Sequence, residues 1–437
     1  MTGSFRGAAD FDPGPQEDIL MSAGDWDLFL SKFDSSGNYI WARTWGGIGA
    51  DYGCEVEWDE SGILYVMGDF EGEVDFNPGP GMDSHMSNGW HDIFLSKFDS
   101  FGNFIWARAW GGRRDDFGCA LAVDGSGNSH ATGMFFGTVD FDPGPGEDIH
   151  TSVGDSDVFV SKFDSSGGLI WARTWGGPYE LSGIRALDVS ADRSGNSYVT
   201  GTFSMSVDFD PGPGEDIRAA IDDYDVFLSK FDSGGDFIWT RTWGGNSFDY
   251  GEGVSIDDSG DVCVTGVFAD LTDFDPGPGE DYHESVGPGD RFLSRFNSDG
   301  YFIWARTWEG GMDIYYIGQG NQSVAIDGSG NPYVTGIFEN EVDFDPGPDV
   351  ENRVSLGHTD AYLSKFDSNG DFIWVQTWGG VLWESSGRVA VDGPGNSYAT
   401  GSFGASVDFN PGPGSDNHVA TGECDAFLVK FPPDGNW

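Results

Sequence analysis

The nine residues DFDPGPGED at positions 140–148 recur seven times along the chain with small changes. The copies begin at seven aspartates: Asp10, Asp75, Asp140, Asp208, Asp273, Asp343 and Asp408. Their spacings are 65, 65, 68, 65, 70 and 65 residues. A regular period of this length predicts one architecture made of tandem copies rather than two or three unrelated domains. We therefore expect residues 1–437 to form a single domain of seven repeats.

One repeat reads as four short strands with tight turns between them. The strands are CALAV within residues 119–128, SHATGMFFGTVDFD at 129–142, DVFVSKFD at 157–164 and LIWARTWGG at 169–177. They are rich in β-branched and aromatic residues, and Gly, Asn, Asp and Ser separate them. Because no stretch of ten or more residues has a 3.6-residue period, the sequence predicts an all-β protein.

The third and fourth strands carry apolar residues at both alternating sets of positions, as in VFVSKF and LIWART. A strand in a sheet that is covered on both faces has this pattern, whereas a sheet with one wet face alternates. Four-stranded sheets packed face to face as propeller blades satisfy it. The sequence therefore predicts a β-propeller of seven four-stranded blades. The alternatives are a β-sandwich, which does not explain seven near-identical units, and a β-solenoid, which usually has shorter rungs.

The two ends of the chain affect the strand count. The second and third strands of the repeat occur seven times, but the first and fourth occur six times. The chain starts with TGSF, inside a second strand, and stops at DGNW, where a fourth strand is due. We expect the first and last blades to be incomplete. Either the sequence is cut from a longer chain, or a neighbouring molecule completes the open edges, which can produce filaments.

The charge balance limits the possible partners. With 21 basic and 73 acidic residues the formal net charge is −52, which disfavours nucleic acid and anionic membranes and favours cations. No apolar run approaches the roughly 20 residues that span a bilayer, and the start MTGSFRGAAD does not read as a signal peptide. All lysines share one repeat position, where we expect each to pair with a carboxylate: Lys32, Lys97, Lys162, Lys230, Lys365 and Lys430, with Arg295 in the remaining copy.

The cysteines give little information about the redox compartment. Cys54, Cys119, Cys263 and Cys424 form no CxxC pair. We expect small buried apolar residues rather than a disulfide framework. A bridge between Cys54 and Cys119, which occupy equivalent positions in neighbouring repeats, stays open.

Each DFDPGP corner carries three oxygen-bearing side chains in the pattern D-x-[DN]-x5-[DE], with Pro-Gly-Pro after the second. The candidate metal ligands are Asp10, Asp12 and Asp18; Asp75, Asn77 and Asp83; Asp140, Asp142 and Asp148; Asp208, Asp210 and Asp216; Asp273, Asp275 and Asp281; Asp343, Asp345 and Glu351; Asp408, Asn410 and Asp416. Every substitution keeps an oxygen atom, and oxygen is the ligand atom of Ca²⁺. Residues i and i+2 of a strand point to one side, and Pro and Gly fold the chain back. The pattern therefore predicts one Ca²⁺ loop per blade.

The alternative is a stiff hairpin in which the aspartates only cap backbone N–H groups, as they commonly do in turns. Capping readily explains one aspartate and explains three crowded oxygens less well. Two further repeated positions favour structural roles. An aspartate two places before the aromatic residue of each third strand is expected to accept backbone hydrogen bonds or pair with a lysine: Asp27, Asp92, Asp157, Asp225, Asp290, Asp360 and Asp425. Ten residues after each corner's first aspartate lies a mostly basic position, expected to be a charge partner: Leu20, His85, His150, Arg218, His283, Arg353 and His418.

The segments 157–177 (DVFVSKFDSSGGLIWARTWGG) and 195–203 (GNSYVTGTF) resemble the seven-bladed propeller repeat known as SBBP, which is common in predicted bacterial extracellular proteins. The resemblance covers nearly the whole chain. It implies a propeller fold and a secreted or cell-surface setting, and it implies no catalytic residue.

Catalysis uses particular residues once, so we looked for breaks in the repeat. The two extensions, at 178–196 and 309–323, contain no Ser-His-Asp or Cys-His arrangement and no distinctive pair of acids. The glycines belong to turns rather than to a phosphate-binding loop. The sequence therefore predicts a non-enzymatic, calcium-binding protein of adhesion, matrix or fibre assembly, with itself or a polysaccharide as partner. A lectin-like propeller or a propeller enzyme that acts on polysaccharides is the alternative.

Overall fold

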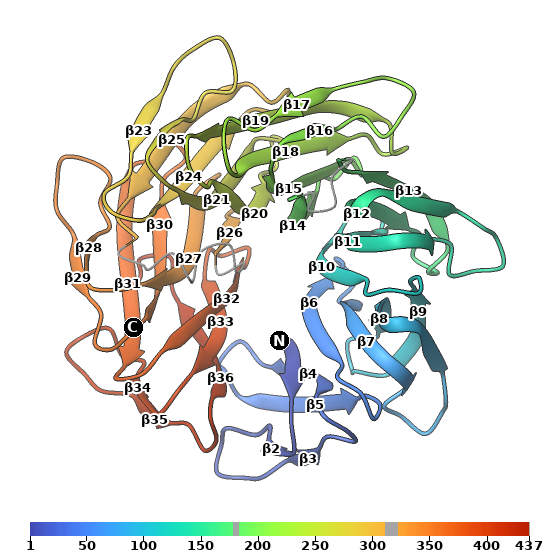
Figure 1. Ribbon diagram of the computed structural model, residues 1–437. Coiled ribbons are helices and arrows are strands. Elements are labelled where there is room, and N and C mark those ends of the chain that lie inside the picture. The colour runs from blue at the N-terminus through green and yellow to red at the C-terminus, as the bar shows by residue number, and fades with distance from the viewer. Residues whose placement is uncertain (178–182, 311–321, 437) are drawn as a thin grey trace. The chain divides into compact units, whose positions relative to one another are not determined.

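The computed structural model describes residues 1–177, 183–310 and 322–436. All helices and strands assigned in this part of the chain are β-strands. The described residues therefore contain no helix that is long and apolar enough to cross a membrane. The strands form the blades of a β-propeller, labelled in Figure 1, so the predicted all-β propeller fold is confirmed. Parts of both extensions, residues 178–182 and 311–321, lie outside the described residues.

Each blade uses up to four strands, which we call A, B, C and D in chain order. The A strands are β6 (Tyr52–Trp58), β10 (Phe117–Val123), β14 (Arg185–Ala191), β20 (Tyr250–Ile256), β26 (Ser323–Ile326) and β32 (Glu384–Val391). The B strands are β1 (Thr2–Phe5), β7 (Leu64–Asp75), β11 (Ser129–Asp140), β15 (Ser197–Phe203), β21 (Val262–Phe268), β27 (Pro332–Phe338) and β33 (Ser397–Phe403). The C strands are β4 (Asp27–Phe33), β8 (Ser84–Phe98), β12 (Ile149–Phe163), β18 (Asp225–Phe231), β24 (Asp290–Phe296), β30 (Asp360–Phe366) and β36 (Asp425–Phe431). The D strands are β5 (Tyr39–Trp45), β9 (Phe104–Trp110), β13 (Leu169–Trp175), β19 (Phe237–Gly245), β25 (Phe302–Trp308) and β31 (Phe372–Gly380).

Neighbouring strands of a blade pair antiparallel in the order A-B-C-D, as in β10-β11-β12-β13. The A strand contains a bulge opposite a glycine of the B strand, for example between Gly251 and Gly253 opposite Gly266. The first sheet of the described chain, β1-β4-β5, has no A strand, and the last, β32-β33-β36, has no D strand. The expectation of incomplete first and last blades is confirmed.

The DFDPGP corner is the tip of a hairpin between the B and C strands. In two blades the hairpin continues the long strands β7 and β8, or β11 and β12. In the others it is a separate pair: β2 (Ala8–Asp10) with β3 (Ile19–Met21), β16 (Ser206–Asp208) with β17 (Ile217–Ala219), β22 (Leu271–Asp273) with β23 (Tyr282–Glu284), β28 (Glu341–Asp343) with β29 (Asn352–Val354), and β34 (Ser406–Asp408) with β35 (Asn417–Val419).

The chain divides into two compact units. One unit comprises Met1–Val199, Ser206–Ile217 and Lys230–Ile238, and the other comprises Thr200–Met205, Arg218–Ser229 and Trp239–Trp437. The boundary therefore lies within the fourth repeat, and each unit contains complete blades of its own.

Aromatic side chains hold neighbouring sheets together within each unit. The tryptophan at the end of a D strand packs on the phenylalanine at the end of the next C strand, with ring centroids 4.9 Å apart for Trp110 and Phe163 and 5.1 Å apart for Trp243 and Phe296. Most C strands are buried on both faces, as predicted, whereas β36 of the last blade is partly exposed. The prediction was wrong for the D strands, because each has an isoleucine that is 45–49% exposed: Ile40, Ile105, Ile170, Ile238, Ile303 and Ile373.

The cysteine prediction needs a correction. The structure has no disulfide among the four cysteines, yet Cys263 alone is fully buried, while Cys54 and Cys424 are exposed. Cys54 lies at the bulge of strand β6, between Gly53 and Glu55, where the strand register shifts. A bulged residue is not paired in the ladder, so its side chain need not enter the core.

Candidate functional site

Each corner hairpin is anchored to its blade by the phenylalanine of DFDPGP. Phe141 is buried and packs edge-on against Phe135 at the end of the B strand, with ring centroids 5.3 Å apart. Its backbone N–H donates to the carbonyl oxygen of Asp148 across the turn, at 2.9 Å. The apolar ring therefore fixes the turn to its blade.

The first aspartate of every corner caps the turn. Asp140 Oδ1 accepts hydrogen bonds from the backbone N–H groups of Asp142 and Asp148, at 3.1 and 2.8 Å. The same two bonds occur in all seven corners. One carboxylate oxygen thus satisfies two N–H groups of the turn that have no ladder partner.

The second member of the motif also acts as a cap. Asp142 Oδ1 accepts from the N–H of Gly144 at 2.8 Å, and Asn77 Oδ1 accepts from Gly79 at the same distance. An amide oxygen accepts this bond as well as a carboxylate oxygen does. Capping therefore explains why either Asp or Asn stands at this position.

The third acid pairs with the basic residue two positions later. His150 Nε2 lies 3.3 Å from Asp148 Oδ1, and the same pair forms in four other corners: His85 with Asp83, His283 with Asp281, Arg353 with Glu351 and His418 with Asp416. Where Leu20 replaces the basic residue, the hydroxyl of Tyr39 donates to Asp18 instead. The predicted charge partner is confirmed in these corners.

The three oxygen-bearing side chains of a corner therefore have separate partners. Two accept backbone N–H groups, and the third faces a histidine, an arginine or a hydroxyl. Within the described ranges no group of three or more His, Cys, Asp or Glu side chains could hold a metal ion. In this conformation the donor set is that of a self-capped turn, and Ca²⁺ at the corners stays a prediction.

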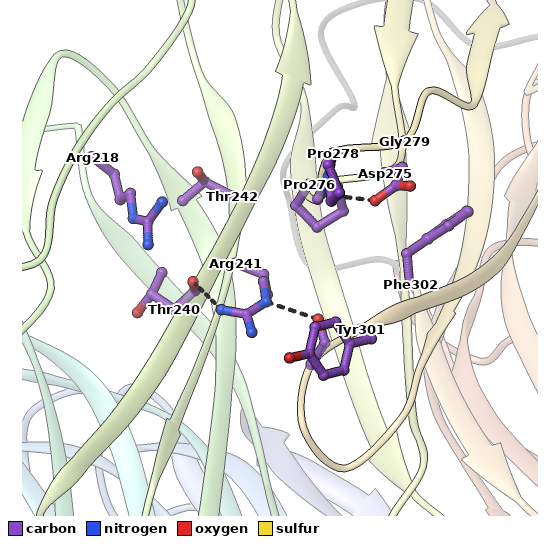
Figure 2. Close-up of a pocket in the computed structure, with 12 residues that line it drawn as sticks. Arg218, Thr240, Arg241, Thr242, Asp275, Pro276, Pro278, Gly279, Tyr301 and Phe302 are labelled. Atoms are coloured by element: carbon purple, nitrogen blue, oxygen red, sulfur yellow. Dashed lines mark hydrogen bonds between the residues drawn. The ribbon is translucent and has the colours of Figure 1, made fainter.

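A shallow groove of about 280 Å³ lies beside the corner of the fifth blade (Figure 2). Strand β19 contributes Thr240 and Arg241 to one side, the Pro276 to Gly279 turn forms another, and Tyr301 lies at the end. A groove of about 300 Å³ occupies the equivalent place between Gln376 and the Pro411 to Gly414 turn. The groove is thus a feature of the repeat.

The guanidinium group in the groove is already engaged. Arg241 Nε and Nη2 donate to the carbonyl oxygens of Gly300 and Asp299, at 2.8 and 3.0 Å, and Figure 2 shows the side chain crossing the groove. Arginines at the same position reach the next blade in the same way: Arg43 to Gly102, Arg108 to Gly167, Arg173 to Gly235 and Arg306 to Gly370. This arginine joins neighbouring blades rather than binding a ligand.

Replacement of Arg241 by alanine is expected to lower the free energy of unfolding by about 2 kcal/mol, because hydrogen bonds from the charged group are lost. Arg241→Gln should cost less than about 1 kcal/mol, since Gln376 occupies the equivalent position and donates to Gly435 O at 2.8 Å. Urea denaturation of the two variants measures the difference. Equal losses of unfolding free energy in the two variants would show that the hydrogen bond between the blades contributes nothing to stability.

The lysine prediction is confirmed in part. Lys162 Nζ lies 3.0 Å from Asp124 Oδ2, and Lys365 and Arg295 lie within ion-pair distance of Asp327 and Asp257. Lys32 and Lys97 instead donate to the carbonyl oxygens of Ser100 and Ser165. The aspartate two places before the aromatic residue of each C strand accepts backbone N–H groups, as predicted; Val153 N, for example, donates to Asp157.

Sequence reasoning missed one unrepeated pair, Asp69 and His91. His91 Nδ1 lies 2.9 Å from Asp69 Oδ2, and its ring lies 5.9 Å from the rings of Tyr52 and Phe117. The close carboxylate raises the pKa of His91, and burial raises the pKa of Asp69. The groups around His91 are aromatic rings and carboxylates, which suit an ion pair rather than acyl transfer. The departure of both positions from the repeat was the signal available in the sequence.

Comparison with known proteins agrees with a propeller and goes no further. No family model matches the chain, so the resemblance to SBBP is not confirmed. The chain is 24% identical over 476 residues to the uncharacterized WD repeat-containing protein L264 of Acanthamoeba polyphaga mimivirus, covering 91% of this chain and 34% of that protein. It is 26% identical over 303 residues to the regulatory protein FlaEY of Caulobacter vibrioides, covering 64% of this chain and 30% of that protein. The chain spans about a third of the length of these relatives.

Two solved structures show low similarity to the chain. The Neurospora crassa Pan2 WD40 domain has a TM-score of 0.36 and 8% identity, covering 79% of this chain and 85% of that one. The rhamnogalacturonan lyase YesW has a TM-score of 0.29 and 12% identity, covering 100% of this chain and 70% of that one. At these scores the likeness indicates nothing about activity.

Proposed function

We propose that the protein is a non-enzymatic β-propeller that acts in a secreted or cell-surface setting, in adhesion, matrix or fibre assembly, with Ca²⁺ as its cofactor. The observation that carries the proposal is the placement of the acidic excess. A chain of net charge −52 repeats an exposed, rigidly capped acidic turn on every blade. The repeated cations are used inside the fold instead, so the outer surface keeps the negative charge.

The capped geometry limits how calcium would bind at a corner. The caps use Oδ1 of the first two residues, so Ca²⁺ would rely on the remaining carboxylate oxygens, backbone carbonyl groups and water. A site of this kind has the low affinity of extracellular modules, with Kd of about 10⁻⁴–10⁻³ M. Binding would reduce the repulsion among the corners and allow copies of the protein to approach one another.

Self-association is the partner interaction that we propose. Ca²⁺ bound at the acidic corners of one copy would offset their repulsion from the corners of another copy.

Thermal unfolding and light scattering with chelator and after Ca²⁺ add-back test this function. Saturating Ca²⁺ should add about 1–3 kcal/mol of stability per occupied site and should increase particle size. Sodium chloride at matched ionic strength is the control for screening. A melting temperature and a particle size that ignore both chelator and Ca²⁺ would overturn the proposal, and saturable sugar binding by a monomer would favour the lectin alternative.

A matched variant separates calcium binding from capping. The second acid is already Asn in two corners, so Asn in the other five should keep the caps while it removes five charges. The substitutions are Asp12→Asn, Asp142→Asn, Asp210→Asn, Asp275→Asn and Asp345→Asn. We expect unchanged stability in chelator and a weaker response to Ca²⁺.

A further inference from the structure

Buried carboxyl groups lie in pairs where one blade meets the next. The first member is the aspartate two places before the aromatic residue of a C strand, and the second lies 24 residues later, directly before or at the start of the following A strand. The described pairs are Asp27 with Asp51, Asp92 with Asp116, Asp225 with Asp249, and Asp360 with Glu384. All eight residues are buried, with at most 3% of their surface exposed.

The second member of each pair ties two blades together. Asp249 Oδ2 accepts from the N–H of Gly245, at the end of β19, at 2.7 Å. Its Oδ1 accepts from the hydroxyl of Thr272 and the N–H of Ala269, in the next blade, at 3.1 and 3.4 Å. Asp51 and Asp116 make equivalent bonds on both sides.

The first glycine of the Trp-Gly-Gly motif marks where the pair meets. A Cβ atom on Gly244 would lie 2.4 Å from Asp225 Oδ1 and 2.9 Å from Asp249 Oδ2, so both oxygens border the space that this glycine leaves open. Asp225 Oδ2 accepts from Ile221 N, but Asp225 Oδ1 is buried without a hydrogen-bond partner. Two further titratable groups lie near the pair, Tyr224 and Tyr250, whose rings stack with their centroids 5.7 Å apart. Besides burial, the negative charge of Asp225 raises the pKa of Asp249.

The pair Asp360 and Glu384 lies at the equivalent positions of another blade. Asp360 Oδ1 and Glu384 Oε1 are both buried without a hydrogen-bond partner. A Cβ atom on Gly379 would lie 2.3 Å from Asp360 Oδ1, while the N–H of the adjacent Gly380 donates to Glu384 Oε2. Asp360 is the charge that acts on Glu384.

We propose that the pair Asp225 and Asp249 binds one proton, shared between its two carboxyl groups, and that this proton locks neighbouring blades together. Two ionised carboxylates in a buried site repel each other and lack donors, whereas one proton supplies the missing O–H donor. A metal ion fits less well. Ca²⁺ needs six to eight oxygens, and the described residues contain no group of three acids that could hold a metal.

The acidities are consistent with a retained proton. Burial raises the pKa of Asp249 to about 8, with a further contribution from Asp225. Burial likewise raises the pKa of Asp116 and of Glu384 to about 7 and that of Asp225 to about 6. Because these values exceed those of the unfolded chain, the folded protein holds extra protons. The contribution of these groups to the stability of the fold should therefore be fully present below about pH 4 and should be lost as the pH rises toward 8.

The substitution Asp225→Asn tests the shared proton. The Asn oxygen can accept from Ile221 N, and its amide can donate to Asp249 in place of the proton. We expect the melting temperature of Asp225→Asn to exceed that of the wild type by several degrees at about pH 9 and to match it at about pH 5. Asp222→Asn, at an exposed residue of the same loop, changes the net charge equally and should show no such pH dependence. High salt in all samples screens the general repulsion.

A direct readout covers the case in which the variant folds poorly. The wild type should show an infrared carbonyl band of protonated carboxyl groups at neutral pH, and the band should weaken in Asp225→Asn. An equal loss of stability at both pH values, or a neutral wild type with no protonated-carboxyl band, would overturn the proposal.

Discussion

Replacement of Gly266 by alanine is expected to destabilise the protein by about 4 kcal/mol, near the upper end for a single substitution. Gly266 lies in β21 opposite the bulge of β20, where the backbones approach closely. A Cβ atom there would lie 1.8 Å from the carbonyl oxygen of Tyr250 and 2.8 Å from the ring of Phe292. Neither the strand backbone nor the packed ring can move aside cheaply, so the sheet itself would have to shift.

Urea denaturation of Gly266→Ala measures this loss, and Gly328→Ala is its control. Gly328 lies in a turn where a Cβ atom would meet nothing within 4 Å, so alanine there should change stability by less than about 0.5 kcal/mol. Similar losses in both variants would mean that the contact with Tyr250 is not the cause, because alanine at either position restricts the unfolded chain and by itself favours folding.

The fold was predictable because the same local sequence signals occur in every repeat. Strand residues, turn residues and the DFDPGP corner recur together, so an error in one copy is corrected by six others. Most C strands read correctly as buried on both faces. The D strands did not, because an apolar residue such as Ile170 has the same letter whether a neighbouring sheet covers it or water does. Only the position of the strand at the edge of its blade decides this.

The corner shows how far residue types can identify a site. The sequence gives the spacing of three oxygens, but not the direction in which each one points. In Asp140 the oxygen turns to two backbone N–H groups, and Asp148 turns to His150. The alternative of capping was therefore the better description of these bonds. The role of His150 could be predicted because its partner lies two residues away in one strand.

Pairs that meet only in three dimensions were out of reach. Asp225 and Asp249 belong to different strands, and their shared environment depends on Gly244, whose missing side chain leaves the space. The sequence shows only that an aspartate, a glycine and an acid recur at fixed spacing. Turn residues that never meet in space would recur in the same way. Burial of both acids, the property that gives them chemistry, follows only from the packing of two blades.

Replacement of Asp124 by alanine is the second change with a large expected effect, about 3–5 kcal/mol. Burial opposes ionisation of Asp124, yet hydrogen bonds from His130, Asn128 and Lys162 hold its pKa well below the usual range. Lys162 is nearly buried, with its Nζ 3.0 Å from Asp124 Oδ2 and 2.9 Å from Gly195 O. Without the carboxylate, the ammonium group stays in the protein interior with no opposite charge. Because the folded pKa of Asp124 is lowered, its contribution is present above about pH 4 and is lost as the pH falls below that value.

The control for this prediction is Asp34→Ala, because Asp34 makes the same local turn bonds in an exposed place. Asp34 accepts from Ser36 N, Asn38 N and the Asn38 side chain, at 2.8, 2.9 and 2.9 Å, as Asp124 does from Ser126 and Asn128. Its loss should cost clearly less than the loss of Asp124, because only the turn bonds are removed. Replacing Lys162 by methionine in the Asp124→Ala protein should recover part of the stability, since the unpaired charge is removed together with its partner. If Asp124→Ala and Asp34→Ala lose the same free energy and the added methionine recovers none, the buried ion pair does not hold the blade in place and the turn bonds account for the whole effect.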